Sequence, residues 1–385
     1  MLLLIAIYIS FISLGLPDSL FGVSWPVVHL EFGTPESFAS IYTIIIGVCT
    51  GGVSFVAGKV IRKFGTGKVT FFSTLLTAIG LIGISFAPNI VLMMVFSIIL
   101  GYGAGAIDTG LNSYVSLHYK AKHMNWLHCF WGMGVAISPM IMSAFLGEGE
   151  GAWRAGYRVV ALLQLAIALF VLATLKKWKR DVPHAGAQEE KSDMSMGQLL
   201  RTSGLVTSIL SLGLYCSAEY VIGTWGATYA VHVHSILPQT AARWVSLYYG
   251  GIMLGRMICG FLPDTISDNQ RIRYGVALSI VGMVILLLPF GNASLAGLLL
   301  IGVGFGPIFP AVIHSVPLRF GATYSADLTG YHMGGAFGFG YAVQLIFGYL
   351  AVLTGYGIMP IVLLLLLGGV FLCNEVTLRK IGQIK

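Results

Sequence analysis

Three carboxylic acids stand inside long apolar stretches of this sequence, where acidic side chains are rare. They are Asp18, Asp108 and Glu219, and the other acidic residues fall in polar segments or near the ends of apolar ones. A carboxylate at the centre of a bilayer costs about 2.5–3.5 kcal/mol on insertion scales. Such an acid marks a functional site by default, so we expect all three to face a water-filled space or a polar partner.

Small and polar residues follow the helical repeat around each of these acids. Three stripes result: Gly15, Asp18, Gly22 and Trp25; Gly101, Gly105, Asp108 and Asn112; and Tyr215, Glu219, Gly223 and Gly226. Residues at these spacings lie on one face of a helix. Because small residues let helices approach closely, the polar groups beside them are expected to line the gap between helices.

Two chemical roles are open for the acids. Desolvation favours the neutral form of a carboxylic acid, so Asp18 and Asp108 could bind and release a proton and serve as ion-coupling groups. Two carboxylates with backbone carbonyls could instead hold Na⁺. The structural alternative is a hydrogen-bonded strut between helices with no chemical role. The sequence does not separate these readings.

Aromatic, amide and imidazole groups near the acids suggest a site for a small polar solute. Each buried hydroxyl of a sugar needs a hydrogen-bond partner, and an aromatic ring supplies a platform. We predict that the solute contacts are Trp25, Asn112, His128, Glu219, Trp225 and His332, with Gln164 and Gln344 as further amides. The alternatives are interfacial anchoring for Trp and a hydrogen-bonded core position for His. No metal or cofactor site is predicted, because His118, His123 and His128 are spaced by five and do not share a face.

The composition indicates where these residues must act. Of 385 residues, 56% are hydrophobic and 10% are charged, whereas a soluble domain carries about 25% charged residues. The chain is therefore expected to be an all-α polytopic membrane protein surrounded by lipid. The net charge of +7 comes from short segments between apolar runs, so it indicates membrane topology and no nucleic-acid partner is predicted.

Twelve apolar runs are long enough to span a bilayer. They lie at 2–30, 38–61, 69–87, 90–117, 125–146, 155–176, 204–232, 242–262, 273–290, 294–317, 327–350 and 356–378. The longest polar stretch predicts a division into a six-helix bundle at 1–176, a cytoplasmic linker at 177–203 and a second bundle at 204–385. Nineteen of the 22 Lys and Arg residues fall on the linker's side, so both termini are expected to be cytoplasmic.

An internal repeat supports the two halves. GYGAGAID from Gly101 resembles GVGFGPIF from Gly302, and LHCFWGMG from Leu127 resembles YHMGGAFG from Tyr331. The first pair lies in the fourth span of each half and the second pair in the fifth. Duplicated bundles with a site between them are the architecture of many secondary transporters.

Two loops resemble those of the major facilitator superfamily. GKVIRKFG from Gly58 stands where that family has G-x-L-x-D-R-x-G, with Arg62 at the usual Asp position, and GFLPD from Gly260 keeps the Gly and the Asp. The resemblance covers the whole chain and implies two pseudo-symmetric six-helix bundles. It also implies that Arg256 and Asp264 belong to the gating loops that latch the cytoplasmic ends.

A narrower resemblance is to the fucose–galactose–glucose:proton symporters. GLPDSL, GAIDTGLN and MNWLHCFWGMG are similar to that group's helix 1, 4 and 5 patterns, with Asp108 for a Glu and His128 for a Gln. The resemblance implies a monomeric secondary transporter in the cell membrane, or cell inner membrane. It would move a small polar solute, with a sugar as the first expectation, by alternating access coupled to H⁺ or Na⁺.

Other functions are less well supported by the sequence. A proton-coupled exporter of drugs or metabolites has the same fold, but GVAISPM from Gly134 lacks the trailing glycines of the exporter pattern in helix 5. A membrane enzyme is not expected, because HExxH, GxSxG and P-loop motifs are missing from the sequence. A sensor that does not transport is the remaining alternative.

Overall fold

The computed structural model describes residues 2–119, 121–147, 149–178, 197, 201–262, 265–288, 291–321 and 325–382. Every regular element in these ranges is a helix. Most of the predicted linker at 177–203 lies outside the described residues, and so does Asp264.

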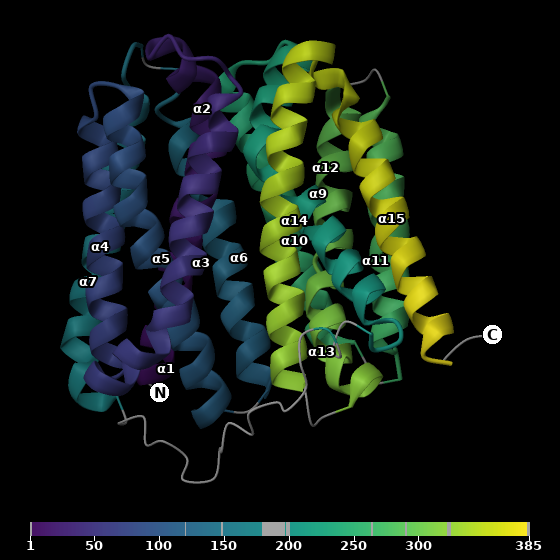
Figure 1. Ribbon diagram of the computed structural model, residues 1–385. Helices are drawn as coiled ribbons and strands as arrows, with labels where there is room; N and C mark the ends of the chain where they lie inside the picture. The colour runs from purple at the N-terminus through teal and green to yellow at the C-terminus, as the bar shows by residue number, and fades with distance from the viewer. Residues whose placement is uncertain are drawn as a thin grey trace. The chain divides into compact units, whose positions relative to one another are not determined.

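Short connections join most successive helices (Figure 1), and residues 178–204 separate η1 from α9. The first part of the chain forms α1 (Leu2–Asp18), α2 (Leu20–Glu31), α3 (Phe38–Phe64), α4 (Thr66–Phe86), α5 (Ile90–His118), α6 (Ala121–Ser143), α7 (Trp153–Thr174) and the 3₁₀ turn η1 (Leu175–Lys177). The second part forms α9 (Leu205–His234), α10 (Pro238–Phe261), α11 (Asp268–Leu286), α12 (Gly291–Phe305), α13 (Ile308–Phe320), α14 (Ser325–Thr354), η2 (Tyr356–Ile358) and α15 (Met359–Lys380).

Each predicted apolar range coincides with one helix, or with two helices in sequence, to within a few residues at its ends. Within the described residues, eight helices or helix pairs are long and apolar enough to cross a membrane. The helices α10 and α11 are more polar than these. Arg243 and Arg256 lie on α10, and α11 carries three charged residues in its first two turns.

Large apolar side chains are exposed along the outer helices. Leu162 and Leu169 on α7 are 59% and 55% exposed, and Leu365 and Leu372 on α15 are 72% and 63% exposed. Within each pair the spacing of seven residues places both side chains on one face. A water-soluble protein seldom exposes such continuous apolar surface, so these faces suit lipid and the chain is a multi-pass membrane protein.

The first predicted span is broken at its centre. The helix α1 ends at Asp18 and α2 begins at Leu20, one residue later. Pro17 has no N–H, so the carbonyl of Ser13 loses its partner within the helix. Gln164 of α7 replaces that partner, because its Nε2 donates to Ser13 O at 2.6 Å while its Oε1 accepts from Ser13 Oγ. The break is therefore stabilised from a neighbouring helix.

A second proline produces a matching arrangement on α6. Pro139 lies within that helix, so the carbonyl of Val135 has no intrahelical donor. Ser19, the single residue between α1 and α2, donates its Oγ to Val135 O at 2.8 Å. Each proline thus frees a carbonyl that a side chain from another helix satisfies, as the interior of a membrane protein requires.

Glycine lies at two further breaks between helices. Gly65, the last residue of the GKVIRKFG segment, joins α3 to α4 with φ 83°, a conformation that glycine adopts without strain. The side chains of Lys59 and Arg62 in that segment lie outside the described part of the chain. In the GVGFGPIF repeat, Gly306 and Pro307 separate α12 from α13, whereas the matching GYGAGAID lies within the unbroken α5.

The chain forms two compact units. Residues 1–182 with 223–253 make up the first, and residues 183–222 with 254–385 make up the second. In the first unit α1 packs against α6, α3 against α5, and α4 against both α5 and α7; in the second, α11 packs against α12, α13 and α15. This grouping follows contacts, whereas the predicted halves 1–176 and 204–385 follow the sequence repeat, so the halves stay a prediction.

Candidate functional site

Asp18 lies at the break between α1 and α2 and is exposed, whereas residues 13–17 and 19–26 around it are buried. Its Oδ2 accepts a hydrogen bond from Trp131 Nε1 of α6 at 2.8 Å. Broken helices of this kind form substrate and ion sites in secondary transporters. The carboxylate is therefore exposed and has a fixed donor, which suits a group that exchanges a proton or an ion.

Close contact between α1 and α6 holds this pair in place. A Cβ atom added at Gly15 would collide with the carbonyl of Trp131, and one added at Gly134 would collide with the carbonyl of Ile12. The two backbones therefore touch one helical turn from Asp18. This contact fixes the distance between the carboxylate and the indole.

Asp108 and Asn112 form the second polar pair of the first unit. Asn112 Nδ2 donates to Asp108 Oδ1 at 2.8 Å and to Asp108 O at 3.0 Å. Both residues lie on α5 and are half-buried. The predicted stripe is confirmed to this extent: the amide and the carboxylate share one face and contact each other. Such an amide can orient the acid and also face a solute.

The remaining predicted residues of the first unit differ in accessibility. His128 of α6 is half-buried, and its ring meets Phe11 edge-on with centroids 5.7 Å apart. Trp25 is 0% exposed, and its Nε1 donates to the carbonyl of Glu36 at 2.8 Å. Trp225 is also fully buried. In this conformation the two indoles present no surface to a solute, so their predicted role stays a prediction.

Glu219 is the half-buried acid of the second unit. Tyr215 and Cys216 lie one turn before it on α9, and both are subject to the charges of Glu219 and of Arg256. Arg256 lies within α10, more than one turn before the helix ends at Phe261. The structure therefore places Arg256 in a helix, near the same side chains as Glu219, rather than in a connecting loop.

His332 is enclosed by polar contacts of its own. It is 0% exposed; its Nε2 lies 2.8 Å from Ser208 Oγ and its Nδ1 lies 2.7 Å from the carbonyl of Leu328. Both ring nitrogens are used inside the second unit, which is the arrangement of a core histidine. His128 and His332 occupy matching positions of the repeat but lie in different environments.

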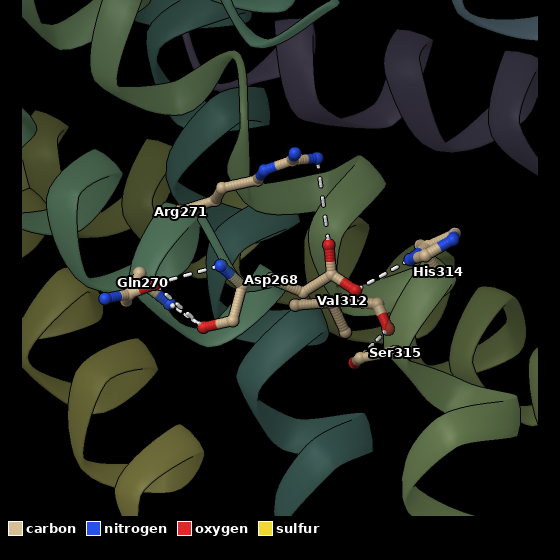
Figure 2. A network of polar contacts seen from close by, with 7 residues as sticks. Asp268, Gln270, Arg271, Val312, His314 and Ser315 are labelled. Atoms are coloured by element: carbon tan, nitrogen blue, oxygen red, sulfur yellow. Dashed lines mark hydrogen bonds and ion pairs between the residues drawn. The ribbon is translucent and has the colours of Figure 1, made fainter. Parts of the chain in front are cut away.

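The end of the second unit near the start of α11 carries a polar network (Figure 2). Asp268 Oδ2 lies 2.7 Å from His314 Nδ1 of α13, and Asp268 Oδ1 lies 3.9 Å from Arg271 Nη1. Ser267 and Gln270 form a capping box that fixes the first turn of α11. Asp268 is thus a paired carboxylate four residues after the predicted gating residue Asp264, which lies outside the described residues.

A buried arginine extends the polar contacts at this end. Arg319 of α13 is 8% exposed, and its Nη2 donates to Asn269 Oδ1 at 2.6 Å and to Asn374 Oδ1 at 2.7 Å. Arg273 and Glu375 form a bidentate ion pair nearby in sequence, with both N–O distances 2.7 Å. These contacts connect α11, α13 and α15, which suits a structural or gating role.

Sequence reasoning missed two residues of this arrangement. Trp131 is not among the solute contacts predicted from the sequence, and Gln164 is predicted there as a further amide for the solute. The amide of Gln164 is instead fully buried against Ser13. A proline four residues after Ser13 was the available signal, because it predicts a carbonyl that needs an outside donor.

Comparisons with known proteins agree with the fold. The sequence profile of the Major Facilitator Superfamily matches residues 7–345. The chain is similar to the glucose/mannose transporter GlcP of Bacillus subtilis (strain 168), at 22% identity over 313 residues, which are 74% of this chain and 75% of that protein.

Two solved structures share the fold across nearly the whole chain. The D-xylose-proton symporter aligns with a TM-score of 0.74 and 12% identity over 98% of this chain and 97% of that one. FucP in its outward conformation aligns with a TM-score of 0.68 and 14% identity over 97% of this chain and 98% of that one. Because the family profile spans most of the chain, this protein belongs to the Major Facilitator Superfamily and is a membrane transporter rather than an enzyme.

Proposed function

We propose that this protein is a secondary active transporter that moves a sugar by alternating access, coupled to a proton gradient. The observation that carries the proposal is Asp18, an exposed carboxylate at a helix break with an indole donor at 2.8 Å. Its relative GlcP is named as a glucose/mannose transporter, and the D-xylose-proton symporter has the same fold. Both names support a sugar as the solute.

The architecture that we propose has twelve membrane-spanning helices in two bundles, at 1–176 and 204–385, with both termini in the cytoplasm. The coincidence of every predicted span with a helix or a broken helix supports this. The distribution of Lys and Arg supports the orientation. In the first bundle we assign Asp18, Asp108 and His128 to transport, and in the second bundle we assign Glu219.

We assign the roles by accessibility and contacts. Asp18 and Asp108 are the ion-coupling groups, because each is an acid in an apolar helix that accepts a hydrogen bond from a neutral side chain. Asn112, His128 and Glu219 are the solute contacts, because all three are half-buried polar groups. Arg256 and Asp264 remain candidates for gating.

The test is uptake by the purified full-length chain in liposomes. Labelled glucose, mannose, galactose, fucose and xylose are offered with an inward pH gradient, with an inward Na⁺ gradient, and with neither. We expect at least one of these sugars to accumulate under the pH gradient and a protonophore to abolish the accumulation. Accumulation that depends on the Na⁺ gradient alone would support sugar transport but would show that the coupling ion is Na⁺ instead of H⁺.

Other results would overturn the proposal. Gradient-driven efflux of lipophilic cations with no sugar uptake would indicate an exporter. No movement of any solute, by protein shown to be folded, would favour a sensor. The matched variant Asp108→Asn distinguishes coupling from binding, because it should lose accumulation while still exchanging sugar across the membrane.

A further inference from the structure

In the first unit, one carboxylate contacts two imidazoles where α2 and α9 end. Glu36 Oε1 lies 3.3 Å from His29 Nε2 and 2.7 Å from His232 Nε2. His29 is in the last turn of α2, Glu36 is in the turn that leads to α3, and His232 is in the last turn of α9. Two distant chain segments, 196 residues apart, therefore meet at one oxygen atom.

The second nitrogen of His29 also faces an acceptor. His29 Nδ1 lies 3.3 Å from the carbonyl oxygen of Thr34. That carbonyl is held in place because the N–H of Thr34 donates back to the carbonyl of His29 at 2.9 Å. A carbonyl and an ionised carboxylate can only accept hydrogen bonds. His29 therefore lies between two acceptors.

The proton count of this cluster follows from the geometry. A neutral imidazole donates from one nitrogen and presents a lone pair at the other. A neutral His29 would therefore turn a lone pair toward either Thr34 O or the Glu36 carboxylate. One added proton on the ring, forming imidazolium, satisfies both acceptors at once, and a charge-assisted bond to carboxylate is about twice as strong as a neutral one.

We propose that His29, Glu36 and His232 form a proton-binding site, separate from the carboxylates Asp18 and Asp108, that fastens the α2–α3 turn to the end of α9. The proton resides on His29, which is 8% exposed. His232 has a side chain 47% exposed, so it opens the site to solvent. His29 is also eleven residues after Asp18, roughly 16 Å along a helix at 1.5 Å per residue.

Close packing between α2 and α9 holds the His29, Glu36 and His232 cluster in place. A Cβ atom added at Gly22 of α2 would collide with the carbonyl of Gly223, so α2 and this part of α9 touch within the first unit. Trp25 packs near His29 with ring centroids 5.8 Å apart, and its Nε1 binds Glu36 O. The backbone of Glu36 is therefore fixed independently of the proton, and protonation affects the side-chain bonds.

Other ionisable groups lie on the helices around this cluster. On α2, Glu31 binds Arg154 and Trp153 of α7. On α9, the ring of His234 meets Tyr229 and Trp244 at 5.5 and 5.4 Å. Arg243 of α10 is exposed. Histidine is the side chain that ordinarily changes charge between about pH 5 and pH 8, and this sets the pH range in which the cluster is tested.

The proton-binding site itself does not depend on the proposed function. Only its position on the outer side of the membrane rests on that proposal. If the termini are cytoplasmic, the site faces the outside and senses external protons. The helix α9 contributes residues to both units, so a bond at its end that depends on pH can favour one transport conformation. A test without solute keeps the two proposals distinguishable.

The experiment is hydrogen–deuterium exchange of the full-length protein in lipid nanodiscs at about pH 5.5 and about pH 8, with intrinsic rates corrected for pH. The peptides that cover 30–40 and 228–236 are followed in wild type, His29→Gln and Glu36→Gln. The matched control is His234→Gln, which removes an imidazole two residues from His232.

In wild type we expect both peptides to be at least about fivefold more protected at the lower pH, because the imidazolium bonds are present there. This difference should vanish in His29→Gln and in Glu36→Gln and persist in His234→Gln. Equal protection at both pH values in wild type would overturn the proposal. Loss of the difference in His234→Gln, or its survival in both site variants, would overturn it as well.

Discussion

Trp131 and Asp18 lie on different helices, and the indole Nε1 of one donates to the carboxylate Oδ2 of the other at 2.8 Å. A hydrogen bond to a charged group contributes about 1.5–3 kcal/mol. Trp131→Phe keeps an aromatic ring and removes the donor. We expect gradient-driven sugar uptake to fall by about tenfold or more, as 1.4 kcal/mol implies.

The control for this prediction is Trp126→Phe. Trp126 lies on the same helix, α6, and is 41% exposed, as an interfacial anchor would be. Its variant should transport at nearly the wild-type rate. Equal losses in the two variants would show that α6 tolerates no change of Trp, and the role of the Asp18 bond would have to be withdrawn.

Asp108 and Asn112 should be separable by kinetics. Asp108→Asn removes the ionisable group while retaining a polar side chain, so it should abolish accumulation under a pH gradient and leave exchange largely intact. Asn112→Ala removes the donor to Asp108 and a proposed solute contact, and it should weaken sugar binding by roughly tenfold, or 1.4 kcal/mol. Counterflow and gradient-driven uptake measure the two effects.

Two results would contradict the roles assigned to the acids and to the solute contacts. If both Asp18→Asn and Asp108→Asn accumulate sugar like wild type, neither acid couples the ion. An unchanged affinity in Asn112→Ala and in Glu219→Gln would place the solute elsewhere. Lys380→Gln is a suitable control because Lys380 is exposed at the end of α15.

Some of this arrangement could be predicted from the sequence because it depends on local spacing. Helix positions followed from apolar length, and the contact of Asn112 with Asp108 followed from a separation of four residues on one helix. The partners of Asp18 and Ser13 could not be found in this way. Trp131 and Gln164 lie 113 and 151 residues away in the chain, and helical periodicity carries no information about which helices touch.

The same limit applies to burial. The repeat suggested equivalent roles for His128 and His332, but His332 is enclosed by Ser208 and Leu328 O. The identity of a residue does not determine whether neighbouring helices cover it. We expect His332→Gln to lower thermal stability through loss of these bonds, by about 1–3 kcal/mol, with no change in the sugar affinity of the folded fraction.

The contact between α1 and α6 gives a prediction about glycine. Gly15→Ala and Gly134→Ala each place a methyl group against backbone of the other helix, and overpacking of this kind costs about 1–3 kcal/mol. Both variants should lose thermal stability and sugar uptake. Gly51→Ala on α3 has open space around the new methyl group and should be close to wild type. Normal uptake by Gly15→Ala would mean that the helices separate at little cost.

The last prediction concerns the carbonyl that Pro17 leaves without a donor. Gln164→Leu should destabilise the protein by about 1–3 kcal/mol, because Ser13 O and Ser13 Oγ would be buried without their partner.

Pro17→Ala supplies an N–H at the correct position for an intrahelical bond to Ser13 O. In the Pro17→Ala background, Gln164→Leu should therefore cost less, with a coupling energy of about 1 kcal/mol or more. Thermal unfolding of the four proteins in one detergent measures that coupling. Pro17→Ala should also straighten the break at Asp18 and reduce uptake even though the protein is stable, since the carboxylate would lose its position beside Trp131. Additive stabilities would show that Gln164 fills space without replacing the lost hydrogen bond.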